Sequence, residues 1–249
     1  MALRLHGKKI QVVLAGFFCL LLLVYVSDRI LTTTAATSLG KPIESIKTEE
    51  KVLAFTINVD WGEEYLPEIF QILKQAQAKA TFFVTGRWAK NHPDLVRQMM
   101  AEGHEVENHG YRHPHPDNLS VADNKEEIKK TESILQGMLG YQTKYYAPPY
   151  GEDGPSGLRA ADELGYKTIL WTLDTVDWQT TDPEVIIQRV VRPAMRHGAQ
   201  PDKRGAIVLM HPKEQTVKAL PEMVAQLRSE GFRLVTVAEL IRLEEKSNP

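Results

Sequence analysis

Two histidines four residues apart, His109 and His113, have the residue type and the spacing that metal chemistry requires. In the segment His-Gly-Tyr-Arg-His, one helical turn or a tight loop can point both imidazoles at one cation. Two neutral imidazoles and one carboxylate make an open three-ligand site for Zn²⁺ or a similar ion. Asp60, which follows an apolar run, is the natural carboxylate. Ordinary histidines beside a proline-rich turn, and a turn or helix-capping Asp60, are the structural alternatives.

The elements that must position these residues alternate along the chain. From Lys51 onward, short β-rich apolar runs alternate with segments of helical periodicity, which predicts an α/β fold around a parallel sheet or barrel. The predicted strands are 52–59, 80–85, 105–107, 143–146, 168–172, 206–210 and 232–235. The predicted helices are 66–77, 93–102, 121–139, 156–163, 183–196 and 217–229. Strands and helices in this alternation fit a barrel.

Polar and aromatic side chains directly follow five of the predicted strands. The segments concerned are 58–62, 108–114, 147–151, 174–178 and 211–212. Barrel enzymes place their chemistry at the C-terminal ends of the strands. We therefore expect these five segments to meet at one rim of the barrel.

Two of these strand ends carry a histidine and a carboxylate that suit proton transfer. His211 closes an apolar strand, where an ionisable group suits a general acid or base. Asp177 can hold that imidazole in one tautomer and raise its basicity. The structural alternatives are a hydrogen-bonded core histidine for His211 and a helix cap for Asp177. Among the aromatic residues nearby, Tyr150 and Trp178 are predicted to stack on sugar rings, and core packing is expected for the others.

The first 30 residues are predicted to target or anchor the chain. Arg4, Lys8 and Lys9 precede an apolar run at 10–26, which is long for a signal peptide and at the lower limit for a membrane span. An uncleaved anchor is the favoured interpretation, with cleavage near Ala35 and Ala36 as the alternative. Positive charge before the run predicts that the following chain is exported. The expected location is the cell membrane, with the domain outside the cytoplasm, or secretion.

The segment 31–50 is polar, threonine-rich and without periodicity, and it is predicted to be a tether leading to a domain at 51–245. The single cysteine, Cys19, lies in the apolar run, so thiol chemistry is excluded from the exported part. The formal net charge of −2 shows no basic excess. Nucleic acid is therefore not expected as a partner.

The five strand-end segments, in this order, resemble the motifs of the polysaccharide deacetylases of the NodB-homology type. This carbohydrate-esterase family has a distorted (β/α) barrel, and the resemblance covers about 51–240. The family motifs are T-F-D-D-G-like, H-x-x-x-H, R-P-P-Y-G-like, D-x-x-D-W and L-x-H-like. Here they read T-I-N-V-D-W-G, H-G-Y-R-H, A-P-P-Y-G, D-T-V-D-W and L-M-H. Five ordered motifs over nearly the whole domain make a specific signal.

The resemblance implies a metal-dependent reaction at the paired histidines. Asp60, His109 and His113 would bind a divalent metal, Zn²⁺ first, with Co²⁺ or Ni²⁺ as alternatives. The implied reaction is hydrolysis of N-acetyl groups on an aminosugar polymer, with the metal polarising both water and amide carbonyl. Peptidoglycan is the expected polymer, and chitin-like oligomers are the alternative.

The resemblance also implies how substrate and protons are handled. The backbone N–H of Tyr150 would stabilise the oxyanion, and Tyr150, Pro149 and Trp178 would line the substrate groove. His211 would protonate the departing amine, oriented by Asp177.

Two positions depart from the family pattern. The family's catalytic base, an aspartate, and the arginine that pairs with it correspond here to Asn58 and Ala147. An amide cannot act as a base, and general-base catalysis is worth about 10²- to 10⁴-fold, so weak activity is expected, with a metal weakly bound or absent. A second register makes Asp60 the base and places Trp61 at a ligand position. Acids that could substitute are Glu63, Glu107, Glu152 and Asp153.

Three functions are compatible with this pattern. The first is a weak metal-dependent deacetylase of cell-wall polysaccharide. The second is a non-catalytic cell-wall-binding member of the same fold. The third is a related amidase acting on a small C–N substrate, against which the predicted anchor argues.

Overall fold

The computed structural model describes residues 39–195 and 201–247. The predicted N-terminal anchor, its alternative cleavage site and Cys19 lie outside the described residues. Within the two described ranges, no helix has the length and apolar character that a membrane span requires.

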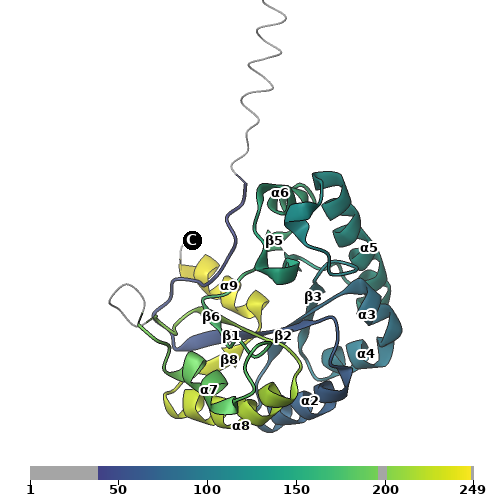
Figure 1. The fold of residues 1–249 in the computed structure, drawn as a ribbon. Helices are drawn as coiled ribbons and strands as arrows, with labels where there is room; N and C mark the ends of the chain where they lie inside the picture. The colour runs from purple at the N-terminus through teal and green to yellow at the C-terminus, as the bar shows by residue number, and fades with distance from the viewer. Residues whose placement is uncertain (1–38, 196–200, 248–249) are drawn as a thin grey trace, which may run out of the picture. The chain divides into compact units, whose positions relative to one another are not determined.

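The described residues form an eight-stranded parallel sheet that curls on itself (Figure 1). The strands are β1 (Val52–Val59), β2 (Ala80–Val84), β3 (Glu105–Asn108), β4 (Tyr145–Tyr146), β5 (Lys167–Thr168), β6 (Leu173–Asp174), β7 (Ala206–Met210) and β8 (Arg233–Val235). Their order is β5-β4-β3-β2-β1-β7-β6, and β8 pairs with the start of β1. This curled α/β sheet agrees with the distorted barrel expected from the sequence.

β1 is the central strand because it is apolar along nearly its whole length. All eight of its residues are buried, as expected for a parallel strand covered on both faces. It pairs with β7 in the register Leu53↔Ala206 and with β2 in the register Phe55↔Ala80. Three strands therefore meet on β1, and its end at Val59 delivers the next residues to the rim.

The seam of the barrel is closed by a segment that precedes β1. β5 and β6, the two ends of the sheet order, belong to one stretch of chain. Ile43 forms a parallel bridge with Ile169 in that stretch, and Ser45 forms an antiparallel bridge with Ala206 of β7. Ile46 is buried. This described part of the predicted tether 31–50 therefore packs as part of the folded domain, which begins before residue 51.

Helices surround the sheet (Figure 1). They are α2 (Leu66–Gln75), α3 (Gly86–Asn91), α4 (Pro93–Ala101), α5 (Val121–Leu139), α6 (Pro155–Glu163), α7 (Pro183–Val191), α8 (Glu214–Ser229) and α9 (Val237–Ser247). Three short 3₁₀ turns are η1 (Glu63–Tyr65), η2 (Pro116–Asn118) and η3 (Pro149–Gly151). α5, for example, begins at Ser120, whose Oγ accepts from the backbone N–H of Asp123, and ends at Gly140 with φ 75°.

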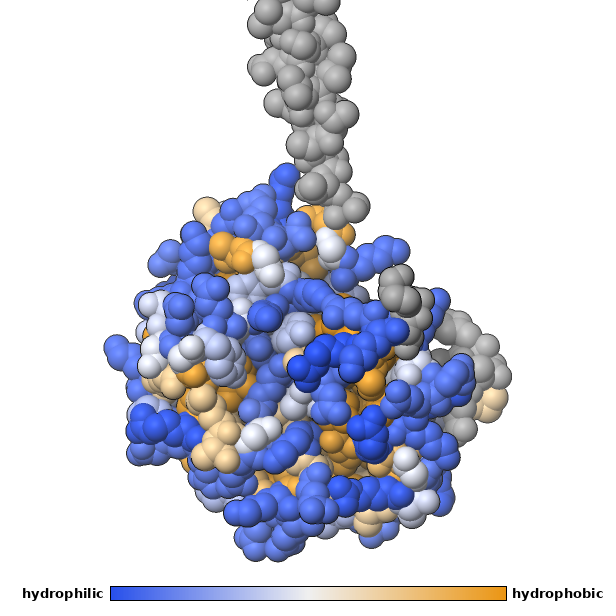
Figure 2. Space-filling view, turned by 180° about the vertical axis from the view of Figure 1, so that it is seen from behind, coloured by the Kyte–Doolittle hydropathy of each residue, from blue (hydrophilic) through white to orange (hydrophobic). Residues whose placement is uncertain are grey.

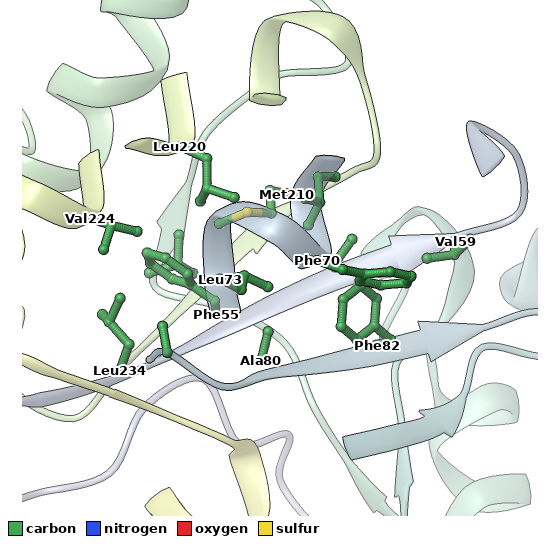
Figure 3. Packing of buried hydrophobic residues seen from close by; sticks show 14 of the residues in the cluster. Phe55, Val59, Phe70, Leu73, Ala80, Phe82, Met210, Leu220, Val224 and Leu234 are labelled. Carbon is green, nitrogen blue, oxygen red and sulfur yellow. The ribbon is translucent and has the colours of Figure 1, made fainter. Parts of the chain in front are cut away.

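The main core lies between the sheet and the helices α2 and α8. Figure 3 shows Phe70 and Leu73 of α2 beside Phe82 of β2 and Leu220 of α8. The rings of Phe70 and Phe82 meet edge to face with centroids 5.5 Å apart. The surface seen from the opposite side to Figure 1 is mostly hydrophilic (Figure 2). This packing makes the strands a rigid support for the loops at their ends.

Candidate functional site

A cavity of about 490 Å³ opens at the C-terminal ends of the strands. Six of the residues selected from the sequence line it, namely Asn58, His109, His113, Tyr150, Trp178 and His211. They come from the ends of β1, β3, β4, β6 and β7, as expected for a barrel. Asp60, Pro149 and Asp177 do not line the cavity and lie in its surroundings.

His109 and His113 stand close together on the loop after β3. Their rings meet edge to face, with centroids 4.9 Å apart. Nδ1 of His109 lies 2.6 Å from the carbonyl oxygen of Ala147. Since a carbonyl oxygen can only accept, Nδ1 carries the proton and Nε2 keeps its lone pair. Burial, together with the neighbouring His113 and His211, lowers the pKa of His109 well below its ordinary value, so this imidazole is neutral.

A carboxylate on α5 holds the histidine loop in place. One oxygen of Glu127 accepts from the backbone N–H groups of Tyr111 and Arg112, at 3.1 and 2.7 Å. The other accepts from Nε of Arg112 at 3.0 Å. His113 itself has φ 61°, an uncommon conformation for a side-chain-bearing residue. Burial lowers the pKa of His113, an effect that the nearby Asp60 carboxylate opposes.

Asp60 is bound by two neighbours rather than aimed into the cavity. Its Oδ1 accepts from Oγ1 of Thr85 at 2.7 Å. Nη2 of Arg87 contacts Oδ1 at 3.2 Å and Oδ2 at 3.0 Å. In the ranges that the structure describes, no three His, Cys, Asp or Glu side chains are grouped so that they could hold a metal ion. The ligand set expected from the sequence is therefore incomplete: the two imidazoles suit a cation, and the carboxylate is engaged elsewhere.

His211 and Asp177 form a hydrogen-bonded pair below the cavity. Asp177 is fully buried, and its Oδ1 lies 2.8 Å from Nδ1 of His211. Its Oδ2 accepts from the backbone N–H of His211 at 2.6 Å and from Oγ1 of Thr216 at 2.7 Å. Because the carboxylate accepts a hydrogen bond from Nδ1–H, Nε2 of His211 is the nitrogen that can take up or release a proton. Trp61 stacks on the His211 ring, with centroids 6.0 Å apart.

Asn58 brings an amide, and not a carboxylate, into the cavity. Its side chain is buried, and its Oδ1 has no hydrogen-bond partner among the described residues. A buried acceptor left unpaired costs about 1–3 kcal/mol, and a ligand N–H or O–H that reached this oxygen would remove that cost. Ala147, where the family has arginine, is also buried and brings no charge.

The acids that could have replaced the base lie elsewhere. None of Glu63, Glu107, Glu152 and Asp153 lines the cavity. Glu107 accepts from the backbone N–H groups of Lys144 and Tyr145, and Glu152 accepts from the backbone N–H of Asp117 at 3.0 Å. Because all four carboxylates lie outside the cavity lining, none of them is a candidate base in this arrangement.

One carboxylate that the sequence analysis gave no role does line the cavity. Asp174, at the end of β6, accepts from the backbone N–H of Val176 at 2.8 Å. Val176 has φ 53°, an outlier for a β-branched residue, so the turn that carries Asp174 is held in a strained conformation. The D-T-V-D-W motif contained the signal, since its first aspartate is the last residue of β6.

Aromatic side chains form the rim of the cavity. Trp178 and Tyr150 are 55% and 57% exposed, and Trp61 is 43% exposed. Tyr150 has φ 61°, and its ring lies face to face with that of His115, with centroids 3.7 Å apart. Exposed, preoriented aromatic faces are suited to stack on the apolar faces of sugar rings.

Pro149 and Trp171 support this rim from below. Pro149 is buried in η3. Gly151 has φ 69°, and a Cβ there would lie 2.5 Å from the Trp171 ring. The absence of a side chain at Gly151 therefore lets Trp171 pack against the turn that presents Tyr150.

Comparisons with known proteins identify the family of this chain. Residues 45–169 match the family model of polysaccharide deacetylases. YlxY, an uncharacterized protein of Bacillus subtilis, is 35% identical over 201 residues, which are 81% of this chain and 60% of that protein. A peptidoglycan-N-acetylglucosamine deacetylase of Bacillus cereus is 33% identical over 208 residues, which are 79% of this chain and 91% of that protein. The chain thus spans less than two thirds of YlxY.

Solved structures are similar as well. A CE4 family pseudoenzyme from Bacillus anthracis has a TM-score of 0.74 at 36% identity, over 81% of this chain and 69% of that one. A mutant of that pseudoenzyme with restored enzymatic activity has the same TM-score at 35% identity, over 81% and 71% of the two chains. From the motif order, the curled barrel and these similarities, this chain belongs to the polysaccharide deacetylase family.

Proposed function

We propose that this protein binds aminosugar chains of cell-wall polysaccharide in the cavity at the C-terminal ends of the strands and hydrolyses their N-acetyl groups slowly. The observation that carries the proposal is the pairing of His211 with Asp177 beside Asn58 in an aromatic-rimmed cavity. The similarity to a peptidoglycan-N-acetylglucosamine deacetylase supports peptidoglycan as the polymer. Chitin-like oligomers share the N-acetylglucosamine chemistry.

The residues of this chain divide the work between binding and proton transfer. Trp178 and Tyr150 hold sugar rings at the rim, and Oδ1 of Asn58 accepts from an N–H or O–H group of the ligand. His211, oriented by Asp177, delivers a proton from Nε2 to the departing amine. Asn58 is an amide and cannot take a proton from the attacking water, which lowers the rate by about 10²- to 10⁴-fold relative to a site with a base at this position. Because Asp60 is engaged by Arg87, no step is assigned to a metal.

Acetate release tests the hydrolytic step. The full chain is incubated with muropeptides and with chitooligosaccharides, once with EDTA and once with added Zn²⁺ or Co²⁺. The wild type is expected to release acetate slowly, and His211→Ala is expected to release none, because it lacks the proton donor. Equal absence of release in the two proteins rules out hydrolysis as the function.

A second function, binding without turnover, is favoured by the unpaired Asn58 oxygen and by the similarity to a pseudoenzyme. It predicts that the wild type retains chitooligosaccharides or peptidoglycan fragments in an equilibrium binding assay while releasing no acetate. His211→Ala is then expected to bind as the wild type does. Absence of binding by the wild type would exclude this function too.

We also propose, from the sequence, that the segment 1–30 keeps the domain at the outer face of the cell membrane or directs its secretion. Peptidoglycan lies in that compartment. Protease added to intact cells is expected to degrade the domain if it is anchored outside. A domain that stays protected until the cells are lysed contradicts this location.

A further inference from the structure

A salt bridge occupies the carboxylate that the histidines would need for a metal site. Nη2 of Arg87 contacts both oxygens of Asp60, at 3.2 and 3.0 Å, and Thr85 donates to the same carboxylate at 2.7 Å. The Asp60 side chain is only 14% exposed, whereas that of Arg87 is 52% exposed. The carboxylate is thus partly shielded from water and has its negative charge balanced within the protein.

The position of Arg87 follows from the way α3 begins. Thr85 caps the helix, since its Oγ1 accepts from the backbone N–H of Trp88. The backbone N–H groups of Gly86 and Arg87 donate to the carbonyl oxygens of Gly110 and Tyr111, at 2.9 and 3.1 Å. Two backbone hydrogen bonds therefore fasten the start of α3 to the histidine loop, and the Arg87 side chain leaves the helix beside that loop.

Close packing keeps this junction fixed. A Cβ at Gly86 would lie 2.6 Å from Oγ1 of Thr131 on α5 and 2.9 Å from the ring of Tyr111. Only a glycine lets α3, α5 and the histidine loop approach this closely.

A guanidinium can take the place of a metal cation beside the Asp60 carboxylate. It carries a permanent positive charge, and its planar donors match a carboxylate. A dication entering between Asp60 and the two imidazoles would lose the attraction of a carboxylate that is already neutralised. It would also meet the repulsion of the like charge on the neighbouring guanidinium.

We infer that Arg87 is a built-in counter-ion for Asp60 that takes the place of a divalent metal, so that this site binds its sugar ligand without a metal. The two neutral imidazoles of His109 and His113 are then left to hydrogen-bond the hydroxyl and amide groups of the ligand. The identity of the ligand rests on the proposed function. The exclusion of the metal is independent of the proposed function, because metal binding can be measured without any sugar.

Metal titration tests the inference on the full chain, purified in detergent without a histidine tag. Zn²⁺ binding is followed by calorimetry, and Co²⁺ binding by its visible absorption. Arg87→Gln is expected to bind both ions at least about fivefold more tightly than the wild type, a change equivalent to about 1 kcal/mol. Arg87→Lys, which keeps the charge but not the planar donors, is expected to lie between the two.

Two further variants make the test specific. Arg97→Gln removes a comparable ion pair with Asp94 on α4, away from the cavity, and is expected to bind metal as the wild type does. Adding Asp60→Asn to Arg87→Gln is expected to abolish the gained affinity, because the gained site uses that carboxylate. Thermal unfolding of each variant verifies that it is folded.

Two results would overturn the inference. One is equal affinity for Zn²⁺ in the wild type and Arg87→Gln. The other is binding of chitooligosaccharide by the wild type that EDTA abolishes and Zn²⁺ restores. If no sugar binds under any condition, the proposed function fails, and the metal titration still decides the role of Arg87.

Discussion

The two ends of the barrel both bury titratable groups, yet they use them differently. At the N-terminal ends of the strands, a cavity of about 850 Å³ is lined by Glu105, Glu107 and His104. Burial and the neighbouring Glu105 raise the pKa of Glu107 to about 8, and burial lowers the pKa of His104 to about 4. At the C-terminal ends, the smaller cavity contains histidines, exposed aromatic rings, the carboxylate of Asp174 and an amide, Asn58.

The difference shows that neither cavity size nor a shifted pKa identifies the functional end. Glu107 accepts from two backbone N–H groups of the neighbouring strand, and Glu105 accepts from Thr81 at 2.6 Å. Oε2 of each carboxyl thus helps to hold neighbouring strands together. At the C-terminal end, the rim aromatics Trp178 and Tyr150 are more than half exposed, and histidines and an amide lie beside them in the cavity. Exposed aromatic faces next to convergent polar groups are the better guide.

The largest expected effect comes from returning a base to the C-terminal end. Asn58→Asp with Ala147→Arg supplies a titratable acceptor and a partner for it in the cavity. Acetate release from chitooligosaccharides is expected to rise about 10²- to 10⁴-fold, the usual worth of a general base. Glu107→Gln, the matched loss of a carboxyl at the other end, is expected to leave the rate unchanged. If Glu107→Gln releases acetate more slowly and the double variant shows no gain, the active site lies at the N-terminal ends of the strands instead.

A pair of glycines with similar backbone angles compares the rigidity of the ends. Gly62 and Gly103 have φ 82° and 76°. A Cβ at Gly62 would lie 2.1 Å from the carbonyl oxygen of Pro212, whereas at Gly103 it would meet the flexible end of Lys79 at 3.2 Å. Gly62→Ala is expected to lower the free energy of unfolding by about 2–5 kcal/mol, and Gly103→Ala by about 1–2 kcal/mol. Urea unfolding measures both, and equal losses would contradict the close packing next to His211.

Removing a rim aromatic tests the binding surface. Trp178→Ala is expected to weaken chitooligosaccharide binding by about five- to thirtyfold, equivalent to about 1–2 kcal/mol, because an exposed stacking face is lost. Tyr141→Ala removes an aromatic ring that is 41% exposed at the other end, and is expected to bind as the wild type does. Calorimetric titration measures the affinity of both variants for chitooligosaccharide. A loss of affinity in Tyr141→Ala alone would show that the sugar binds in the larger cavity.

The smallest expected effect is on the pH dependence of stability. Because the pKa of Glu107 is raised from 4.5 to about 8, the folded chain keeps a proton that the unfolded chain has lost. Its contribution is complete below about 4.5 and is lost as the pH rises to 8. Glu107→Gln is therefore expected to flatten the fall in melting temperature between pH 6.5 and 8, above the range in which His104 acts in the opposite direction.

The exposed Glu64 provides the control for this pH experiment. Glu64→Gln is expected to keep the slope of the wild type. An unchanged slope in Glu107→Gln would mean that this carboxyl is already ionised in the folded protein at neutral pH.

Long apolar runs and strong helical periodicity predicted much of the fold. The strands at 52–59 and 206–210 and the helix at 121–139 have the predicted bounds. The predicted strand 168–172 is instead β5 followed by β6, because each pairs over only two residues with a different neighbour. Neither α3 nor α9 was predicted from the sequence, and α3, with six residues, is too short for a clear helical period.

The site was predictable where it follows strand ends and unpredictable where it depends on pairing across the barrel. His109, His113, Asn58 and His211 line the cavity because each follows or ends a strand. Thr85 and Arg87, the partners of Asp60, also follow a strand end, that of the strand at 80–84, so the same criterion would have selected them. That the carboxylate is bound there follows only from the adjacent ends of β1 and β2.

The bridges made by Ile43 and Ser45 have a consequence for the order in which the molecule folds. The ribosome makes this segment early, but its partners Ile169 and Ala206 come much later in the chain. Contacts so far apart in sequence carry a large entropy of loop closure and form slowly. The seam of the barrel is therefore expected to close last, after synthesis has passed β7, with the earliest residues of the domain completing the structure.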